Sequence, residues 1–119
     1  MKVYMERQSV SMRDDKKAPI RQMFEILENC RIKDFIKILI KNYCPKVNSK
    51  KAAWVLLYKD KTIAVFDSVS KKYSSIYNEN IILKDLLMKN EKQELYLYYK
   101  GDEDINYIIE SESDNYHII

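Results

Sequence analysis

The amino-acid sequence predicts an α+β fold, in which one mixed β-sheet packs on one main α-helix within a single domain. The first observation is a helical spacing of apolar residues near the middle of the chain. The second is a set of short apolar or alternating runs on both sides of it. The third is composition: 119 residues, of which 46% are hydrophobic and 33% charged, suffice for one buried core with a polar surface.

The main helix is predicted over residues 31–43. Six apolar side chains recur there at intervals of three and four residues, which places them on one helical face: Ile32, Phe35, Ile36, Leu39, Ile40 and Tyr43. Asn29 is the expected N-terminal cap, and Pro45 follows the last turn. Burial of such side chains contributes ~1.5–3 kcal/mol each, so this helix is expected at the centre of the core.

The strands are predicted from alternation and from continuous apolar runs. Residues 3–12 and 20–26 alternate and are expected to pair as an antiparallel hairpin, whereas the apolar run 52–58 suits a central strand buried on both faces. The remaining elements are expected in chain order as a strand over 62–66, a loop over 73–80, a short helix over 82–88 and a strand over 95–99.

This order of elements resembles the ubiquitin-like β-grasp fold over about residues 3–100. The matching features are the initial hairpin, the strand end Phe24-Glu25-Ile26, the helix opening Arg31-Ile32-Lys33-Asp34-Phe35, the strand with Trp54, and the late pairing of 83–86 with 95–98. The chain has no C-terminal diglycine, so the resemblance does not extend to the conjugation chemistry of ubiquitin. It implies a domain that acts by binding other macromolecules.

Charge divides the chain into two parts. All 21 Lys and Arg residues lie within positions 1–100 together with 12 acidic residues, whereas positions 101–119 hold six acids and no Lys or Arg. We therefore expect a β-grasp-like domain over 1–100 and an acidic C-terminal segment over 101–119. Two structures are open for this segment, an additional strand over 105–109 or a tail.

The residue types predict no enzyme, no cofactor and no metal site. A single glycine, Gly101, cannot build the glycine-rich loops that bind phosphates in Rossmann and P-loop proteins. The one histidine, His117, lies close to the end of the chain, where a catalytic base is poorly held. Cys30 and Cys44 lie at opposite ends of the predicted helix and are expected to be free thiols.

The expected location is the cytoplasm, with no membrane partner. The N-terminal residues contain no long apolar run, and no stretch approaches the roughly 20 apolar residues of a membrane-spanning helix. Two cysteines fit a reducing compartment. The frequent use of Lys, Ile, Asn and Tyr resembles proteins of AT-rich bacteria.

Three groups of residues are candidates for binding a partner. Lys33, Lys37 and Lys41 recur every four residues on the helix face opposite the core, which suits an acidic partner or an ordinary solvated face. Tyr96 and Tyr98 alternate with two leucines and are expected on the outer side of their strand, where tyrosine serves as a binding anchor or simply as a good strand former. The third group is acidic and consists of Asp102, Glu103 and Asp104.

These observations favour a non-enzymatic protein-binding module, and a toxin-neutralising immunity protein is one kind of protein that would fit. The partner would then be another protein, such as a toxin domain with a basic surface. The alternative is a small nucleic-acid-binding protein that uses the basic helix face and the tyrosines. A net charge of only +3 and the acidic segment weigh against this alternative.

Overall fold

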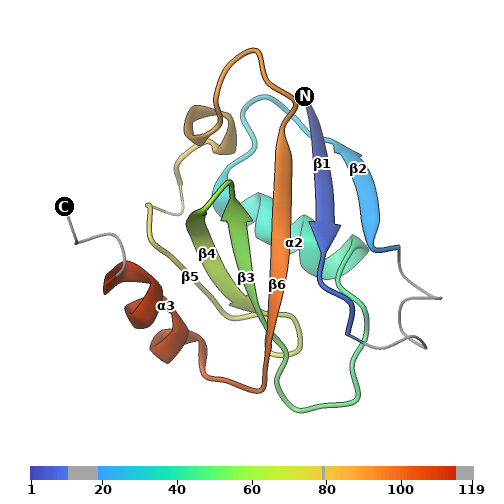
Figure 1. The fold of residues 1–119 in the computed structure, drawn as a ribbon, viewed down its shortest axis with the longest axis vertical. Helices are drawn as coiled ribbons and strands as arrows, with labels where there is room; N and C mark the ends of the chain where they lie inside the picture. Colours follow the sequence, from blue (N-terminus) through green and yellow to red (C-terminus); the bar gives the residue numbers. More distant parts are fainter. Residues whose placement is uncertain (11–18, 79, 115–119) are drawn as a thin grey trace.

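A six-stranded mixed sheet forms the framework of the computed structural model, which describes residues 1–10, 19–78 and 80–114 (Figure 1). The strand order is β2-β1-β6-β3-β4-β5, and the central β1 and β6 are parallel whereas the other neighbours are antiparallel. The strands are β1 (Lys2–Arg7), β2 (Arg21–Glu25), β3 (Ala53–Tyr58), β4 (Lys61–Asp67), β5 (Tyr73–Ser75) and β6 (Glu94–Gly101). The predicted α+β class with a mixed sheet is therefore confirmed.

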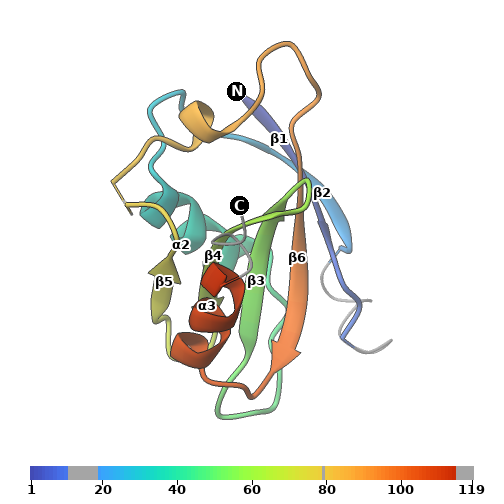
Figure 2. The ribbon, with the colours of Figure 1, turned by 60° about the vertical axis from the view of Figure 1, so that its left-hand side comes forward.

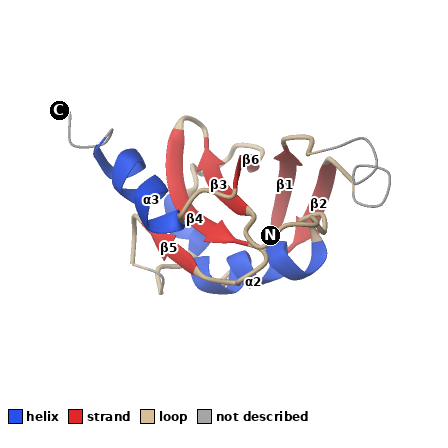
Figure 3. Cartoon of the chain, turned by 90° about the horizontal axis from the view of Figure 1, so that it is seen from below, coloured by secondary structure: helices blue, strands red, loops and turns tan. Residues whose placement is uncertain are grey.

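The main helix α2 (Ile32–Asn42) covers one side of this sheet (Figure 3). Its buried residues Ile32, Phe35, Ile36 and Leu39 follow the predicted spacing, and all four are 0% exposed. The core between α2 and the sheet includes Trp54 and Phe66, whose side chains point toward the helix side from β3 and β4. This packing confirms the sequence prediction that α2 organises the core.

The predicted cap of α2 is wrong. The N-terminal capping position is Arg31, and its side chain makes no capping hydrogen bond. The helix start is instead attached to the segment before the 3₁₀ turn η1 (Leu83–Leu86), because the Ile32 amide donates to the Ile81 carbonyl at 3.0 Å. The Leu83 amide in turn donates to the Cys30 carbonyl at 2.8 Å. A backbone acceptor supplied by a distant segment thus replaces the side-chain oxygen that Asn29 was expected to provide.

A second helix, α3 (Ile105–Asp114), lies on the opposite side of the sheet against β4 and β5 (Figure 2). It buries Ile105 and Ile108 against Val55 and Val65. The strand predicted over 105–109 is therefore wrong, since these residues are helical. Asp104 caps the helix through Oδ1, which accepts the Asn106 amide at 2.9 Å. The division of the chain into a 1–100 domain and a 101–119 segment stays a prediction.

Three smaller differences separate the predicted elements from the structure. The first strand ends at Arg7 rather than at residue 12, and residues 11–18 lie outside the described residues. The 73–80 segment contains the short edge strand β5, which pairs with β4 through Tyr73 to Ser75. The predicted helix over 82–88 is a single 3₁₀ turn, η1 (Leu83–Leu86). Strand β3 shifts register against both neighbours, between Leu56 and Leu57 where it pairs with β4 and between Ala53 and Trp54 where it pairs with β6.

None of the helices in the described residues has the length and apolar character needed to cross a bilayer.

Candidate functional site

The outer side of the sheet, opposite α2, is divided into two halves. We call the part beneath α3 the covered half; its side chains are Ala53, Val55 and Val65, all at most 2% exposed. We call the part formed by β2, β1 and β6 the open half, because no helix of the described residues lies over it (Figures 2 and 3). Its outward side chains are Arg21, Met23, Tyr4, Glu6, Glu94, Tyr96 and Tyr98.

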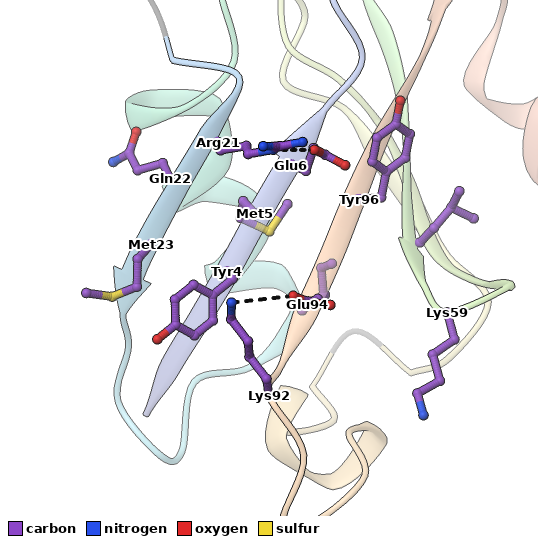
Figure 4. Close-up of a pocket in the computed structure, with 12 residues that line it drawn as sticks. Tyr4, Met5, Glu6, Arg21, Gln22, Met23, Lys59, Lys92, Glu94 and Tyr96 are labelled. Carbon is purple, nitrogen blue, oxygen red and sulfur yellow. Dashed lines mark hydrogen bonds and ion pairs between the residues drawn. The ribbon is translucent and has the colours of Figure 1, made fainter.

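Strand pairing places the side chains of the open half in rows across the sheet. Tyr96 lies opposite Glu6 on β1 and opposite Leu57 on β3. Tyr4 lies between Glu94 on β6 and Met23 on β2. Neighbours on one face of a sheet are about 4.5–5.5 Å apart at their Cβ atoms, so each row is a continuous surface. The rows line a shallow hollow of about 700 Å³ (Figure 4).

Ion pairs neutralise most of the charge on the open half. Arg21 Nε donates to Glu6 Oε1 at 2.5 Å, and Lys92 Nζ lies 3.6 Å from Glu94 Oε1 (Figure 4). Lys59 Nζ, at the edge of the hollow, donates to Glu91 Oε2 at 2.7 Å. Carboxylates and cations therefore alternate across the face, and the surface has no strong excess of either sign.

Two lysine ammonium groups also lie over tyrosine rings. Lys92 Nζ is 4.4 Å from the centroid of the Tyr4 ring, and Lys100 Nζ is 5.1 Å from the centroid of the Tyr98 ring. Both distances are within the range of cation–π attraction. Each lysine covers part of one ring face, and Tyr98 is still 40% exposed.

The Tyr96 hydroxyl is held in its neutral form. Burial raises the pKa of Tyr96, and the Glu6 carboxylate and the Tyr98 hydroxyl raise it further. The hydrogen bond to Glu6 raises the pKa of Arg21, so the guanidinium stays charged at neutral pH. The face thus offers a phenolic hydrogen-bond donor and acceptor between an ion pair and apolar groups, which suits non-covalent recognition.

The structure places the predicted site residues in three separate regions. Tyr96 and Tyr98 point outward on the open half, as their alternation with Leu95 and Leu97 predicted. Lys33, Lys37 and Lys41 lie on α2, on the other side of the sheet. The acidic residues Asp102, Glu103 and Asp104 are exposed in the connection between β6 and α3. The basic helix face and the tyrosines therefore do not form one surface.

On β1 and β2, the sequence reasoning missed four residues of the open half: Tyr4, Glu6, Arg21 and Met23. They join Tyr96 only because β1 pairs in parallel with β6, although about 90 positions separate the two strands in the chain. The available signal was the alternation of buried and outward residues within the first strand. That signal gives the side on which Tyr4 and Glu6 lie, but it does not give their neighbours.

The described part of the chain contains no cluster of metal ligands, and its two thiols are protonated. No group of three or more His, Cys, Asp or Glu residues lies together there in a way that could hold a metal ion. Burial raises the pKa of the Cys44 thiol to about 12 and also raises that of Cys30, so both thiols are protonated at neutral pH. His117 lies outside the described residues.

Comparison with known proteins gives no match to a family model, to a curated protein or to a solved structure.

Proposed function

We propose that this protein is a non-enzymatic protein-binding module and that the open half of the sheet is its binding face. The observation that carries the proposal is the exposed aromatic and apolar surface of β2, β1 and β6, where Tyr98 is 40% and Met23 45% exposed. Tyrosine, arginine and methionine are enriched at protein interfaces, and tyrosine offers a large rigid area with a polar tip.

The balanced charge of this face indicates a protein partner. The Arg21–Glu6 and Lys92–Glu94 pairs leave hydrogen-bonding groups of both signs around the aromatic side chains. A polar rim around an apolar centre is the usual composition of a protein interface. A nucleic acid would instead favour an uncompensated excess of cations, since its affinity depends on neutralising phosphates.

We further propose that the domain has the β-grasp topology. The central parallel pair of β1 and β6, the antiparallel hairpin of β1 and β2, and the helix between β2 and β3 all support this assignment. Because β-grasp domains mostly act by binding other macromolecules, the topology fits the proposed function. The finer suggestion of a toxin-neutralising immunity protein stays a prediction.

The alternative of a nucleic-acid-binding protein has one favourable observation. Lys92 and Lys100 lie over two tyrosine rings of the open half, and aromatic rings beside cations are used to stack single-stranded bases. It ranks second, because Glu94 lies in the same row as Tyr4 and Glu6 lies opposite Tyr96. The lysines of α2 are also on the opposite side of the sheet.

The test uses the wild-type protein and two variants to capture a partner from the source cells, and the captured protein is then identified. Tyr96→Ala/Tyr98→Ala removes the aromatic groups of the open half, whereas Tyr107→Ala removes a tyrosine of α3 that is 69% exposed. We expect a protein retained by the wild type and by Tyr107→Ala to be lost by the double variant. Calorimetry with the purified partner then measures a reduction of at least about tenfold in affinity.

Two results would change the assignment, and a third would refine it. Retention of the partner by the double variant would remove the open half as the binding face. A mobility shift of a single-stranded oligonucleotide that is abolished by the same double variant would favour the nucleic-acid alternative. If the captured protein is a toxin whose effect on growth is relieved by coexpression, the immunity suggestion is supported.

A further inference from the structure

A groove lies on the α2 side of the sheet, away from the open half. It runs between the C-terminal half of α2 and the turn that joins β4 to β5, and its volume is about 760 Å³. Its lining is mainly aliphatic and includes Ile36, Ile40, Pro45, Val47, Val69 and Tyr73. Val69 is 42% exposed, so part of this apolar surface faces solvent.

One wall of the groove is a turn that the Asp67 carboxylate holds in place. Asp67 is 4% exposed, and its Oδ1 accepts the backbone amides of Val69 at 2.9 Å and Ser70 at 3.0 Å. The same carboxylate also accepts the Ala52 amide at 3.3 Å. Lys71 has a positive φ of 66° at the end of this turn, and its amide donates to the Asp67 carbonyl at 2.8 Å. The wall is therefore formed before any ligand arrives, which lowers the entropic cost of binding.

Four exposed lysines surround the apolar lining: Lys37, Lys41, Lys46 and Lys71. None of them takes part in an ion pair within the described residues, whereas Lys59, Lys84 and Lys92 are each paired with a glutamate. The nearby carboxylate of Asp67 is already occupied by backbone amides. The groove thus combines an apolar floor with an uncompensated positive rim.

We infer that this groove binds an acidic segment of a partner protein. The apolar side chains of the bound segment would occupy the floor beside Val47 and Val69, and the Asp or Glu side chains of the segment would pair with the surrounding lysines. The complementarity is twofold, because an apolar floor requires apolar groups and a positive rim requires anions. The inference is independent of the proposed binding face, which lies on the other side of the sheet.

Two other anionic ligands fit the groove less well. An acyl chain would fill the floor, but its single headgroup would leave most of the four lysines without a partner. A nucleic acid would neutralise the lysines, but bases are recognised by stacking on aromatic rings, and Tyr73 is the one aromatic side chain in the lining. An acidic segment satisfies both parts of the groove.

The test measures binding of a short fluorescein-labelled peptide of alternating Glu and Leu residues by fluorescence polarisation. Two matched peptides separate the two contributions: one has Lys in place of Glu, and the other has Ser in place of Leu. We expect the Glu–Leu peptide to bind at least about tenfold more tightly than either matched peptide. Its affinity should also fall with added salt.

Variants of the protein locate the bound peptide. Lys41→Glu/Lys71→Glu reverses two charges at the groove and should weaken binding by about tenfold or more. Lys61→Glu/Lys89→Glu makes the same change in net charge at exposed lysines outside the groove and should leave the affinity within about twofold. Amide chemical-shift changes in the wild type should concentrate in residues 36–47 and 68–73.

Several outcomes would overturn the inference. They are equal binding of the Glu–Leu and Glu–Ser peptides, equal losses in the two double variants, or shift changes confined to the open half. Binding of a labelled single-stranded oligonucleotide or of oleate, without binding of the Glu–Leu peptide, would assign the groove to that other ligand. Absence of peptide binding at millimolar concentration would remove the site altogether.

Discussion

The covered and open halves of the outer sheet face differ most clearly at two neighbouring residues. Val55 on β3 and Tyr98 on β6 are direct cross-strand partners, yet Val55 is 2% exposed and Tyr98 is 40% exposed. Helix α3 lies over the first and no described helix lies over the second. The same sheet surface thus serves as a second small core on one side and as an accessible aromatic surface on the other.

The difference in exposure between the two halves indicates which side chains stabilise the fold and which are available for binding. In the covered half the outward residues are Ala and Val, which only pack, whereas in the open half they are Tyr, Met, Arg and Glu. Burial stabilises apolar side chains in proportion to the area removed from water. Substitutions in the covered half should therefore reduce stability, and those in the open half should mainly reduce binding.

Removal of residues 102–119 should have the largest effect. The charge pattern of the sequence predicts a folded truncated domain, but the packing of α3 predicts the opposite result. Loss of Ile105 and Ile108 exposes Val55 and Val65, and each buried aliphatic side chain contributes ~1.5–3 kcal/mol. The contributions of these side chains together are a large share of the about 5–15 kcal/mol by which a typical domain is stable. Chemical denaturation measures it, and an unchanged unfolding midpoint would show that the domain ends before α3.

The next largest effect is expected for Ile108→Asp, which places a carboxylate beneath α3. Ile108 is 2% exposed, so the variant should lose several kcal/mol, because a buried charge without a partner is costly. Tyr107→Asp is the matched control, since Tyr107 is 69% exposed on the same helix and should change stability by less than about 0.5 kcal/mol. Similar losses in the two variants, measured by urea denaturation, would mean that α3 does not pack with this face inward.

A smaller effect is expected for Glu112→Ala, which removes the polar contact between α3 and β4. Thr62 Oγ1 donates to Glu112 Oε2 at 2.7 Å, and Thr62 is 1% exposed. Hydrogen bonds to a charged acceptor contribute about 1.5–3 kcal/mol when well shielded, so a loss near 1–2 kcal/mol is expected. Glu110→Ala, at an exposed position on the same helix, removes the same charge and should leave the melting temperature nearly unchanged.

The sequence was informative wherever one periodicity extended over enough residues. The spacing of Ile32, Phe35, Ile36 and Leu39 covers two helical turns, and only a helix places all four on one face. Residues 105–109 are too few to separate two periods, because Ile105 and Ile109 fit both alternation and helical spacing. The buried pair Ile105 and Ile108 and the cap at Asp104 are helical signals, but the packing partner that decides between them is on β3 and β4.

The candidate site was less predictable than the fold, because it depends on which strands become neighbours. Alternation within one strand correctly placed Tyr96 and Tyr98 on the outer side. Their neighbour Glu6 is reached only through the parallel pairing of β1 with β6, and no local pattern encodes that pairing. The groove on the other side likewise needs Val69 and Lys71 to fold back beside α2, which follows from the turn at Asp67.

The smallest stability change is expected for Tyr98→Ser, a substitution in the open half. Tyr98 is 40% exposed, it belongs to neither buried cluster of the described residues, and the Lys100 ammonium lies 5.1 Å from the centroid of its ring. Exposed substitutions usually change stability by less than about 0.5 kcal/mol, although the loss of a strand-forming aromatic adds a little. We expect a nearly unchanged midpoint in urea together with reduced partner binding. A loss as large as that of Ile108→Asp would mean that the open half stabilises the fold, and the division of the outer face into a structural and a binding half would then fail.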